Sequence, residues 1–382
     1  MRKRNRLDDE AKPTNRRRFL KAGTAMTAGL AGAATLGFPQ VSRAQTIVLK
    51  MQGAWSTQDI FNDYAEDYVK RVNEMGAGRL KINYLVAGSV VKPWQVQDAV
   101  HKGVLDAGHQ VTAHWYGKNK AGALFGTGPV FGQNAHHTLA WIHYGGGQAF
   151  YDELVQKIMG LNLVGFFCMP MPAQPLGWFN KRIKRVRQLK GLRYRTVGLA
   201  ADIMKAVGLK VSQLPSKDIF PALERGAIEA FEYNNPTSDS RFGAQDVAKT
   251  YMLGSFHQPM DFFEIIYNKT KYESLPKEHQ AILKYAAEAA TTANFGLALD
   301  TYSKDLQRLI DLYGVEVYRT PESVMEEQLE AWDKVLRELM RDRFVVKVLE
   351  SQMDWARRVA FYELHNSPDY RLAYEHYFGK LD

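Results

Sequence analysis

The sequence predicts an α/β protein built from two similar lobes and followed by a mainly helical carboxyl-terminal region. The first observation is an internal repeat, because residues 98–107 (DAVHKGVLDA) and 221–230 (PALERGAIEA) share the pattern A-[VL]-x-x-G-x-[IL]-[DE]-A. Each copy is typical of an amphipathic helix that ends at a glycine and leads into a buried strand. Similar patterns are common at helix ends, so coincidence stays open as the alternative. The second observation is the helical spacing of apolar residues in the last hundred positions.

An alternating apolar run precedes each copy of the repeat and predicts a strand, Leu80–Leu85 in one case and Leu209–Leu214 in the other. We expect the first lobe to comprise residues 45–172 and 262–300, and the second residues 173–261. With 46% hydrophobic residues, the chain can bury a large core. No low-complexity linker separates the lobes, which favours intertwined domains that share a hinge.

The carboxyl-terminal region, residues 301–382, is predicted to be mainly helical. Helical spacing already begins in residues 281–306. Thr320-Pro321-Glu322 then predicts a helix start, with Thr320 as the capping hydroxyl and proline in the first turn. We expect these helices to brace the lobes or to join subunits.

Residues 1–44 are predicted to be a cleaved export signal. Residues 15–21 (NRRRFLK) place adjacent arginines before Phe-Leu-Lys, which resembles the twin-arginine signal of proteins exported in the folded state. A short Ala/Gly-rich apolar stretch follows, and residues 42–44 (SRA) provide small residues for cleavage. The stretch falls short of the ~20 residues that span a bilayer, which disfavours a membrane anchor. A basic cytoplasmic tail is the other alternative.

The charge of the remaining chain is nearly balanced. Residues 1–44 hold ten of the 50 Lys and Arg residues and three of the 41 Asp and Glu residues, which leaves 40 against 38. The overall excess of +9 therefore gives no argument for a nucleic-acid or membrane partner. The single cysteine, Cys168, excludes an internal disulfide and any multi-cysteine metal or redox motif. No dinucleotide-binding or serine-nucleophile motif is present, so no catalytic constellation is visible.

Short motifs spread over the mature chain carry a family resemblance. They are the G-x-x-D-A strand of the first repeat, Trp115–Lys118, Leu124-Phe125, Gly177–Asn180, and a central block of Leu189–Arg195, Gln213–Pro215 and Ala222–Tyr233. Together they resemble the extracytoplasmic solute-binding proteins of the tripartite ATP-independent periplasmic (TRAP) transporters. The resemblance implies a two-lobe periplasmic-binding-protein (Venus-flytrap) fold with a ligand cleft between the lobes. Within that family the chain is most similar to the branch that binds 2-oxo and 2-hydroxy acids, marked by Gln174, Arg195 and Glu232 in that order.

Arg195 is the strongest candidate for binding a carboxylate. Alternation in the predicted strand Leu192–Thr196 turns Arg193 and Arg195 to the same face, and residues 181–195 hold eight Lys or Arg, so a solvated basic surface is the alternative from the residues alone. The family resemblance selects Arg195. A guanidinium suits this role because its fork of donors makes two charge-assisted hydrogen bonds to a carboxylate.

In the resembling branch, a glutamine, a glutamate and the next backbone carbonyl hold a cation that also contacts the bound acid. The corresponding residues here are Gln174, Glu232 and Tyr233, where Tyr233 replaces the tryptophan usual in that branch. An all-oxygen set implies Na⁺ or Ca²⁺. Glu264 is a further candidate for the cation or, as the alternative, a buried and paired carboxylate that lines the hinge. A pairing of Glu232 with a nearby arginine is likewise open.

Aromatic candidates for the walls of the cleft are Trp55 and Tyr116, with Gln52 beside them, because they follow predicted strands of the first lobe. Core packing with an exposed polar tip is the alternative for Trp55 and Tyr116.

The implied function is that of a periplasmic receptor, not an enzyme. It would bind a small monocarboxylate such as pyruvate or lactate with a bridging cation and deliver it to TRAP membrane permease subunits. The resemblance further implies a homodimer through the helical tail, with no nucleic-acid partner. Which acid is bound, and whether the cation is Na⁺ or Ca²⁺, stay open. The alternative function is an exported cofactor-dependent oxidoreductase acting on a hydroxy acid, because the twin-arginine route carries proteins that fold around cofactors.

Overall fold

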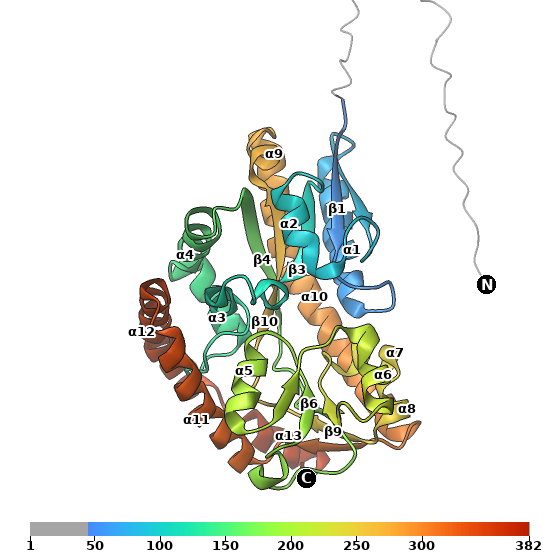
Figure 1. Cartoon of the computed structure of the whole chain (residues 1–382). Helices are drawn as coiled ribbons and strands as arrows, with labels where there is room; N and C mark the ends of the chain where they lie inside the picture. The colour runs from blue at the N-terminus through green and yellow to red at the C-terminus, as the bar shows by residue number, and fades with distance from the viewer. Residues whose placement is uncertain (1–44, 382) are drawn as a thin grey trace, which may run out of the picture. The chain divides into compact units, whose positions relative to one another are not determined.

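The computed structural model describes residues 45–381, which form two lobes, each built around one β-sheet (Figure 1). The predicted signal in residues 1–44 lies outside the described residues. The first sheet has the strand order β2-β1-β3-β10-β4. Its strands are β1 (Ile47–Gly53), β2 (Leu80–Leu85), β3 (Ala107–Val111), β4 (Leu163–Met171) and β10 (Asp261–Asn268). β1 is parallel to β2 and β3, whereas β10 runs antiparallel between β3 and β4 and is buried along its whole length.

The second sheet has the strand order β11-β9-β5-β8-β6-β7. Its strands are β5 (Gly177–Phe179), β6 (Arg193–Arg195), β7 (Lys210–Ser212), β8 (Ala230–Phe231), β9 (Thr250–Leu253) and β11 (Glu316–Arg319). Helices α5 (Gly198–Val207), α6 (Ile219–Glu224), α7 (Pro236–Phe242) and α8 (Ala244–Val247) connect and cover these strands. The chain crosses between the sheets after β4, after β9 and again between β10 and β11, so the lobes are intertwined.

The internal repeat has the predicted structure in both lobes. Helix α2 (Val96–His101) leads into β3, and α6 leads into β8. The glycines of the shared pattern, Gly103 and Gly226, have φ values of 72° and 65°. This left-handed conformation ends a helix with little strain only at glycine. The two predicted strands before the repeats are also present, as β2 and β7.

Helix α10 (Lys277–Asp311) spans both lobes. It packs on β4 and on α1 (Ile60–Gly76) in the first lobe, and on α7 in the second. Leu283 accordingly lies in the apolar core of the first lobe, while Leu309 lies in that of the second. The smaller helices of the first lobe are α3 (Ala135–Tyr144), α4 (Gly147–Asp152) and α9 (Lys269–Glu273).

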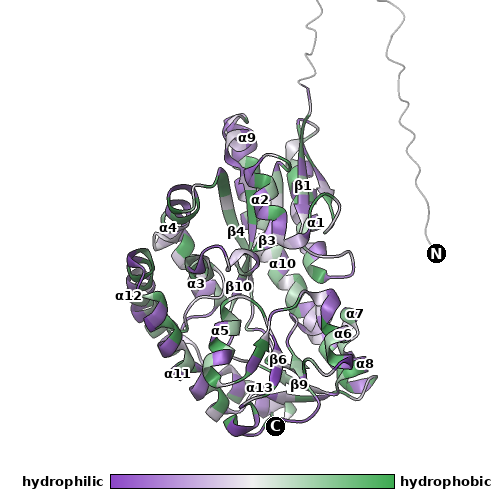
Figure 2. Cartoon of the chain, in the orientation of Figure 1, coloured by the Kyte–Doolittle hydropathy of each residue, from purple (hydrophilic) through white to green (hydrophobic). Residues whose placement is uncertain are grey.

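The carboxyl-terminal region contains α11 (Glu322–Leu339), α12 (Arg343–Asn366) and α13 (Tyr370–Phe378). Helix α11 packs on α5 and α12 packs on α3. Figure 2 shows polar and apolar residues side by side along both, as expected of amphipathic helices with one face on the lobes. The sequence did not predict β11, which extends the second sheet from within this region.

The predicted cap of α11 is wrong in its details. The helix begins as expected after Pro321, but Pro321 itself is the N-cap residue and no side chain caps the helix. Thr320 instead follows β11, and its backbone N–H donates to the carbonyl of Leu253 at the end of β9. Sheet pairing thus fixes the backbone of Thr320, and its hydroxyl has no hydrogen-bond partner within residues 45–381.

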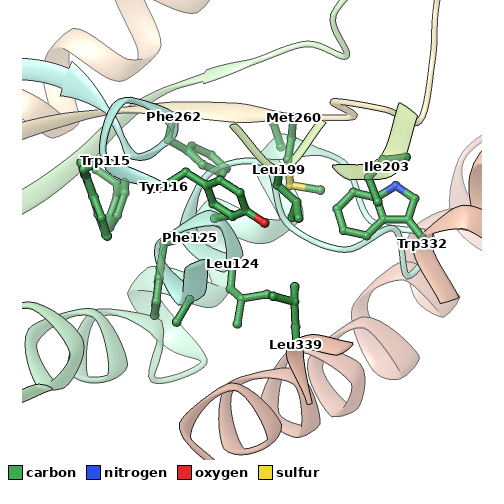
Figure 3. Close-up of a cluster of buried hydrophobic side chains, with 14 of the residues drawn as sticks. Trp115, Tyr116, Leu124, Phe125, Leu199, Ile203, Met260, Phe262, Trp332 and Leu339 are labelled. Carbon is green, nitrogen blue, oxygen red and sulfur yellow. The ribbon is translucent and has the colours of Figure 1, made fainter. Parts of the chain in front are cut away.

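One apolar cluster joins the two lobes. Figure 3 shows Trp115, Tyr116, Leu124 and Phe125 of the first lobe in one cluster with Leu199 and Ile203 of α5 and with Trp332 and Leu339 of α11; Leu339 lies beside Leu124, and Trp332 lies beside Ile203. All of these side chains are buried or nearly so. Burying these apolar side chains stabilises the contact between the two lobes on this side, because apolar burial contributes about 25 cal/mol per Å². None of the helices within residues 45–381 is long and apolar enough to cross a bilayer.

Candidate functional site

A cavity of about 110 Å³ lies between the two sheets. Parallel strands end at its walls: Trp55 follows β1, His114 follows β3, Arg195 ends β6, and Tyr233 follows β8. Carboxyl ends of parallel strands are the usual position of ligand sites in α/β proteins. The volume accommodates several water-sized groups, because one water occupies about 10–15 Å³ on this measure. The cavity is therefore of the size expected for a small ligand.

Arg195 is buried at the cavity wall and is held by the backbone. Its Nε donates to the carbonyl of Leu214 (2.9 Å), and its Nη1 donates to the carbonyl of Glu232 (2.7 Å) and to Glu232 Oε1 (3.1 Å). Among residues 45–381, no hydrogen bond uses Nη2. The guanidinium is thus fixed on one side and has donors to spare for a ligand. Arg193, the alternative on the same strand, is exposed and pairs with Glu229.

Glu232 and Gln174 each have a buried oxygen without a partner. Glu232 Oε1 contacts Arg195, but Glu232 Oε2 and Gln174 Oε1 have no hydrogen-bond partner of good geometry among the described residues, and the Thr196 hydroxyl near Glu232 is unpaired as well. Burial raises the pKa of Glu232 to about 7, against the opposing effects of the Arg195 charge and the Thr196 hydroxyl. Unpaired buried oxygens are costly, so their presence at a cavity indicates a missing positive or hydrogen-donating group. Gln174 lines the cavity, whereas Glu232 lies behind Arg195.

Two ionisable residues of the cavity were not among the sequence predictions. Asp261, the first residue of β10, lines the cavity; its Oδ2 accepts from Gln258 Nε2 (2.8 Å), and burial raises its pKa to about 7. His114 also lines the cavity, and its Nδ1 has no partner within residues 45–381. Burial and the nearby Arg195 charge lower the pKa of His114 to about 4, so the ring is neutral at pH 7. The only feature of the sequence that could have pointed to Asp261 is its position three residues before the predicted candidate Glu264.

Trp55 and Tyr233 form aromatic walls of the cavity. Trp55 is 9% exposed and packs edge-on against Phe61 and Phe263. Tyr233 comes from the second lobe, but its hydroxyl donates to Asp59 Oδ2 (2.7 Å), which caps α1 of the first lobe. Tyr233 thus contacts the cavity with its ring and joins the two lobes with its hydroxyl.

Three predicted residues lie away from the cavity. Tyr116 is buried, and its hydroxyl donates to Asp202 of α5 (2.8 Å). Glu264 is buried and accepts hydrogen bonds from Trp115, Tyr151 and Gln110, which is the paired-carboxylate alternative. The amide of Gln52 holds the backbone of residues 90 and 91. A β-bulge between Phe262 and Phe263 separates Asp261 from the regular part of β10 that carries Glu264.

The oxygens at this site fit a hard cation. Within the described part of the chain, no cluster of three or more His, Cys, Asp or Glu side chains could hold a metal ion. Amide and carbonyl oxygens would therefore have to complete a cation site, as Gln174 and the backbone after Glu232 can. Na⁺ and Ca²⁺ accept such mixed oxygen ligands, whereas Zn²⁺ prefers nitrogen and sulfur.

Comparison with known proteins identifies relatives over most of the chain. The family model of bacterial extracellular solute-binding protein, family 7, matches residues 51–344. A monocarboxylate 2-oxoacid-binding periplasmic protein of Nostoc is 39% identical over 227 residues, which are 59% of this chain and 61% of that protein. The match thus covers less than two thirds of that relative's length.

Three solved structures of TRAP transporter solute-binding proteins share the fold. That of Colwellia psychrerythraea, with bound calcium and pyruvate, has a TM-score of 0.78 and 30% identity, covering 87% of this chain and all of its own. That of Pseudoalteromonas atlantica, with bound sodium and pyruvate, has a TM-score of 0.78 and 28% identity over 87% and 99% of the two chains. That of Bordetella bronchiseptica, a mixed-occupancy dimer with calcium and picolinate, has a TM-score of 0.75 and 30% identity over 86% and 98%.

These matches confirm the two-lobe binding-protein fold and favour a receptor over the exported oxidoreductase. The chain belongs to family 7 of the bacterial extracellular solute-binding proteins, the TRAP transporter receptors, whose members bind solutes and are not enzymes.

Proposed function

We propose that this protein is the periplasmic receptor of a TRAP transporter and binds a small 2-oxo or 2-hydroxy monocarboxylate, such as pyruvate or lactate, with a bridging cation. It would deliver the acid to the membrane permease. The observation that carries the proposal is the buried Arg195, which lines the cavity together with Gln174 and is fixed by backbone carbonyls and by Glu232, so that its Nη2 has no protein partner among residues 45–381. The Nostoc relative and the pyruvate-bound neighbours support the same class of ligand.

The acid's carboxylate would bind Nη2 of Arg195. Because Nε and Nη1 already donate to Leu214 and Glu232, the guanidinium needs no rearrangement when the ligand enters. Charge-assisted hydrogen bonds contribute about 1.5–3 kcal/mol each. His114, neutral at pH 7, adds a second polar contact without changing the charge of the site.

The cation would be held by Gln174 Oε1, Glu232 Oε2 and the carbonyl of Tyr233, which are the residues that the resemblance selects. It would offset the negative charge that a bound carboxylate adds beside Glu232. Asp261 offers a further carboxylate in the cavity, whereas Glu264 is left out because protein donors already occupy both of its oxygens. Na⁺ and Ca²⁺ are both compatible with this set.

Binding would act through closure of the lobes. The acid contacts Arg195 of the second lobe, and the cavity wall opposite it belongs to the first lobe. A ligand that bridges both lobes binds the closed state better than the open one and shifts the population toward it. The permease would then recognise the closed form.

The second copy of the chain is the proposed partner for the carboxyl-terminal helix. None of the residues of α13 is buried, and its surface carries Tyr370, Leu372, Tyr377 and Phe378, each at least 68% exposed. Apolar surface of this kind marks an interface. A homodimer through α13 would cover it, in line with the dimer of the Bordetella neighbour.

Export through the twin-arginine route is part of the proposal and rests on residues 1–44. Replacing Arg16, Arg17 and Arg18 by lysine should keep the full-length precursor in the cytoplasm. Fractionation of cells that express the wild type and the triple variant measures this. Equal amounts of mature protein in the periplasm would contradict the route but leave the binding proposal intact.

A thermal-shift panel tests the binding proposal. Pyruvate, lactate, longer 2-oxo acids, dicarboxylates and sugar acids are each added with sodium, calcium or a chelator. A ligand at a hundred times its dissociation constant stabilises the folded state by about 2.7 kcal/mol. We expect one class of monocarboxylate to raise the melting temperature of the wild type and to leave Arg195→Ala unchanged. No response to any acid would overturn the proposal.

A further inference from the structure

A second, larger cavity adjoins the ligand cavity. Its volume is about 560 Å³, compared with about 110 Å³ for the inner one. The two cavities share the lining residues Ala54, Trp55, Pro93, Trp94, Pro215, Ser216 and Tyr233. The larger volume, called the outer cavity below, therefore adjoins the cavity that Arg195 lines. Only the side chains that both cavities share separate a molecule bound at Arg195 from it.

One wall of the outer cavity is a row of aromatic rings that continues into the inner cavity. Trp94 lies 6.2 Å from the His114 ring, which lies 5.3 Å from Trp55, measured between ring centroids. His114 is neutral at pH 7, so this wall carries no charge. Pro215 and Tyr233 of the second lobe line the opposite side. The lining is thus rich in flat apolar surfaces, which pack best against another flat ring.

The exposure of the Trp94 side chain is not explained by a small ligand in the inner cavity. It stands in a single 3₁₀ turn, Pro93–Gln95, and its side chain is 42% exposed. A half-exposed indole at the mouth of a ligand cavity is typical of a group that a ligand covers. Lys92 and Lys217, both exposed, and the carboxylate of Asp218 line the same cavity, so its charged groups carry a net charge of +1, which favours the approach of an anion.

We propose that the outer cavity binds the side chain of a 2-oxo acid that carries an aryl group, a 3-aryl-2-oxopropanoate, whose carboxylate binds Arg195. The inference rests on the proposed function, because it uses the same arginine, and it narrows the ligand class. The carboxylate and the 2-oxygen fit the small polar inner cavity, and the aryl ring lies between Trp94 and the Pro215 side of the outer cavity. Pyruvate, which has only a methyl group, leaves the outer cavity unfilled.

Isothermal titration of the mature protein with pyruvate, 4-methyl-2-oxopentanoate and phenylpyruvate tests the proposal. Wild type, Trp94→Ala and Trp94→Phe are compared, with Tyr285→Ala as the control. Tyr285 is also an exposed aromatic residue (56%), but it lies on α10 and lines neither cavity. Because Trp94 is half exposed, its replacement removes little buried surface, and circular dichroism of each variant checks that it is folded.

The aryl acid is expected to bind the wild type at least ten times more tightly than pyruvate. Trp94 also lines the inner cavity, so the test compares the two acids: Trp94→Ala should lower the aryl affinity about ten times more than the pyruvate affinity, a difference equal to about 1.4 kcal/mol. Trp94→Phe should recover most of the loss, and Tyr285→Ala should change nothing. Pyruvate binding without aryl binding would overturn this inference and leave the proposed function standing. Tighter binding of the branched acid than of the aryl acid, or aryl binding insensitive to Trp94→Ala, would also overturn it. Failure of all three acids would instead refute the proposed function.

Discussion

Replacing Tyr233 by phenylalanine is expected to weaken ligand binding about tenfold while the cavity keeps its aromatic wall. The Tyr233 ring lines the cavity from the second lobe, and its hydroxyl donates to Asp59 Oδ2 of the first lobe (2.7 Å). Ser238 of α7 also bonds Asp59, at Oδ1 (2.8 Å). Because this contact joins the two lobes, we expect it to break when they separate. Removing the hydroxyl therefore disfavours the closed state without removing any contact to the ligand.

The expected magnitude follows from the partners that remain. A hydrogen bond to a charged group contributes about 1.5–3 kcal/mol. Asp59 keeps two donors in the variant, the N–H of Phe61 and the Ser238 hydroxyl, so the lower end of that range applies. A free-energy change of about 1.4 kcal/mol alters an equilibrium tenfold. If the closed state is a minor population before binding, the apparent affinity falls by the same factor.

Isothermal titration with the best acid from the thermal-shift panel measures the affinity, and small-angle scattering measures the open fraction. Burial raises the pKa of Asp59, so mildly alkaline buffer keeps this carboxylate ionised. Tyr151→Phe is the matched control. It removes a 2.7 Å hydrogen bond from a tyrosine to Glu264, another buried carboxylate that keeps two donors, but within the first lobe. Both variants should lose similar stability, and only Tyr233→Phe should lose affinity.

Equal affinities of Tyr233→Phe and the wild type would refute the reasoning, since the hydroxyl would then contribute nothing to closure. Equal losses in both variants would also refute it, because the effect would come from general destabilisation.

Three further predictions concern the arginine, the cation and the carboxyl-terminal helix. Arg195→Lys keeps the charge but loses the hydrogen bonds that fix the guanidinium to Leu214 and Glu232. Because each charge-assisted bond contributes about 1.5–3 kcal/mol, we expect the affinity for the acid, measured by isothermal titration, to fall tenfold to hundredfold. An unchanged affinity would contradict the role of Arg195. Burial raises the pKa of Glu232 to about 7, so below that pH a cation must displace a proton. Calcium affinity should therefore fall about tenfold per pH unit below 7 and level off above it. Calorimetry at several pH values measures this dependence, and Glu232→Gln is expected to bind calcium weakly at every pH. A wild-type calcium affinity that does not change with pH would count against Glu232 as a ligand. Deletion of residues 369–382 removes the exposed aromatic residues of α13 and should convert the dimer to a monomer in light scattering; a dimer that persists would place the interface elsewhere.

The local elements could be predicted because they depend on short-range patterns. The glycines of the repeat, Gly103 and Gly226, end their helices in the left-handed conformation, which glycine adopts without strain because it has no side chain. The strand with Arg195 at its end and the long helix after residue 277 follow from alternation and helical spacing. The choice between Arg193 and Arg195, however, came from the family resemblance, because alternation placed both on one face.

The composition of the cavity depended on long-range pairing, which sequence periodicity does not contain. Asp261 and Glu264 are three residues apart on one strand and belong to the same residue class. The bulge in β10 and the neighbours on β3 and β4 decide that Asp261 lines the cavity, while Glu264 is enclosed by Trp115, Tyr151 and Gln110. Tyr116 follows a first-lobe strand as predicted, but α5 of the other lobe covers it.

The sequence by itself determined the two-lobe α/β architecture, the repeat, the helical carboxyl-terminal region and, through the family resemblance, the carboxylate-binding class of the protein. Only the tertiary structure decided which polar groups meet: Arg195 with the backbone of Glu232, Tyr233 with Asp59 across the lobes, and Trp94 with the mouth of the cavity. The physical reason is that secondary structure follows from steric and hydrophobic preferences within a few residues. A binding site, by contrast, is formed by side chains far apart in the sequence, from 37 residues for Arg195 and Glu232 to 174 for Tyr233 and Asp59, and their meeting depends on how strands pair and how the two sheets pack.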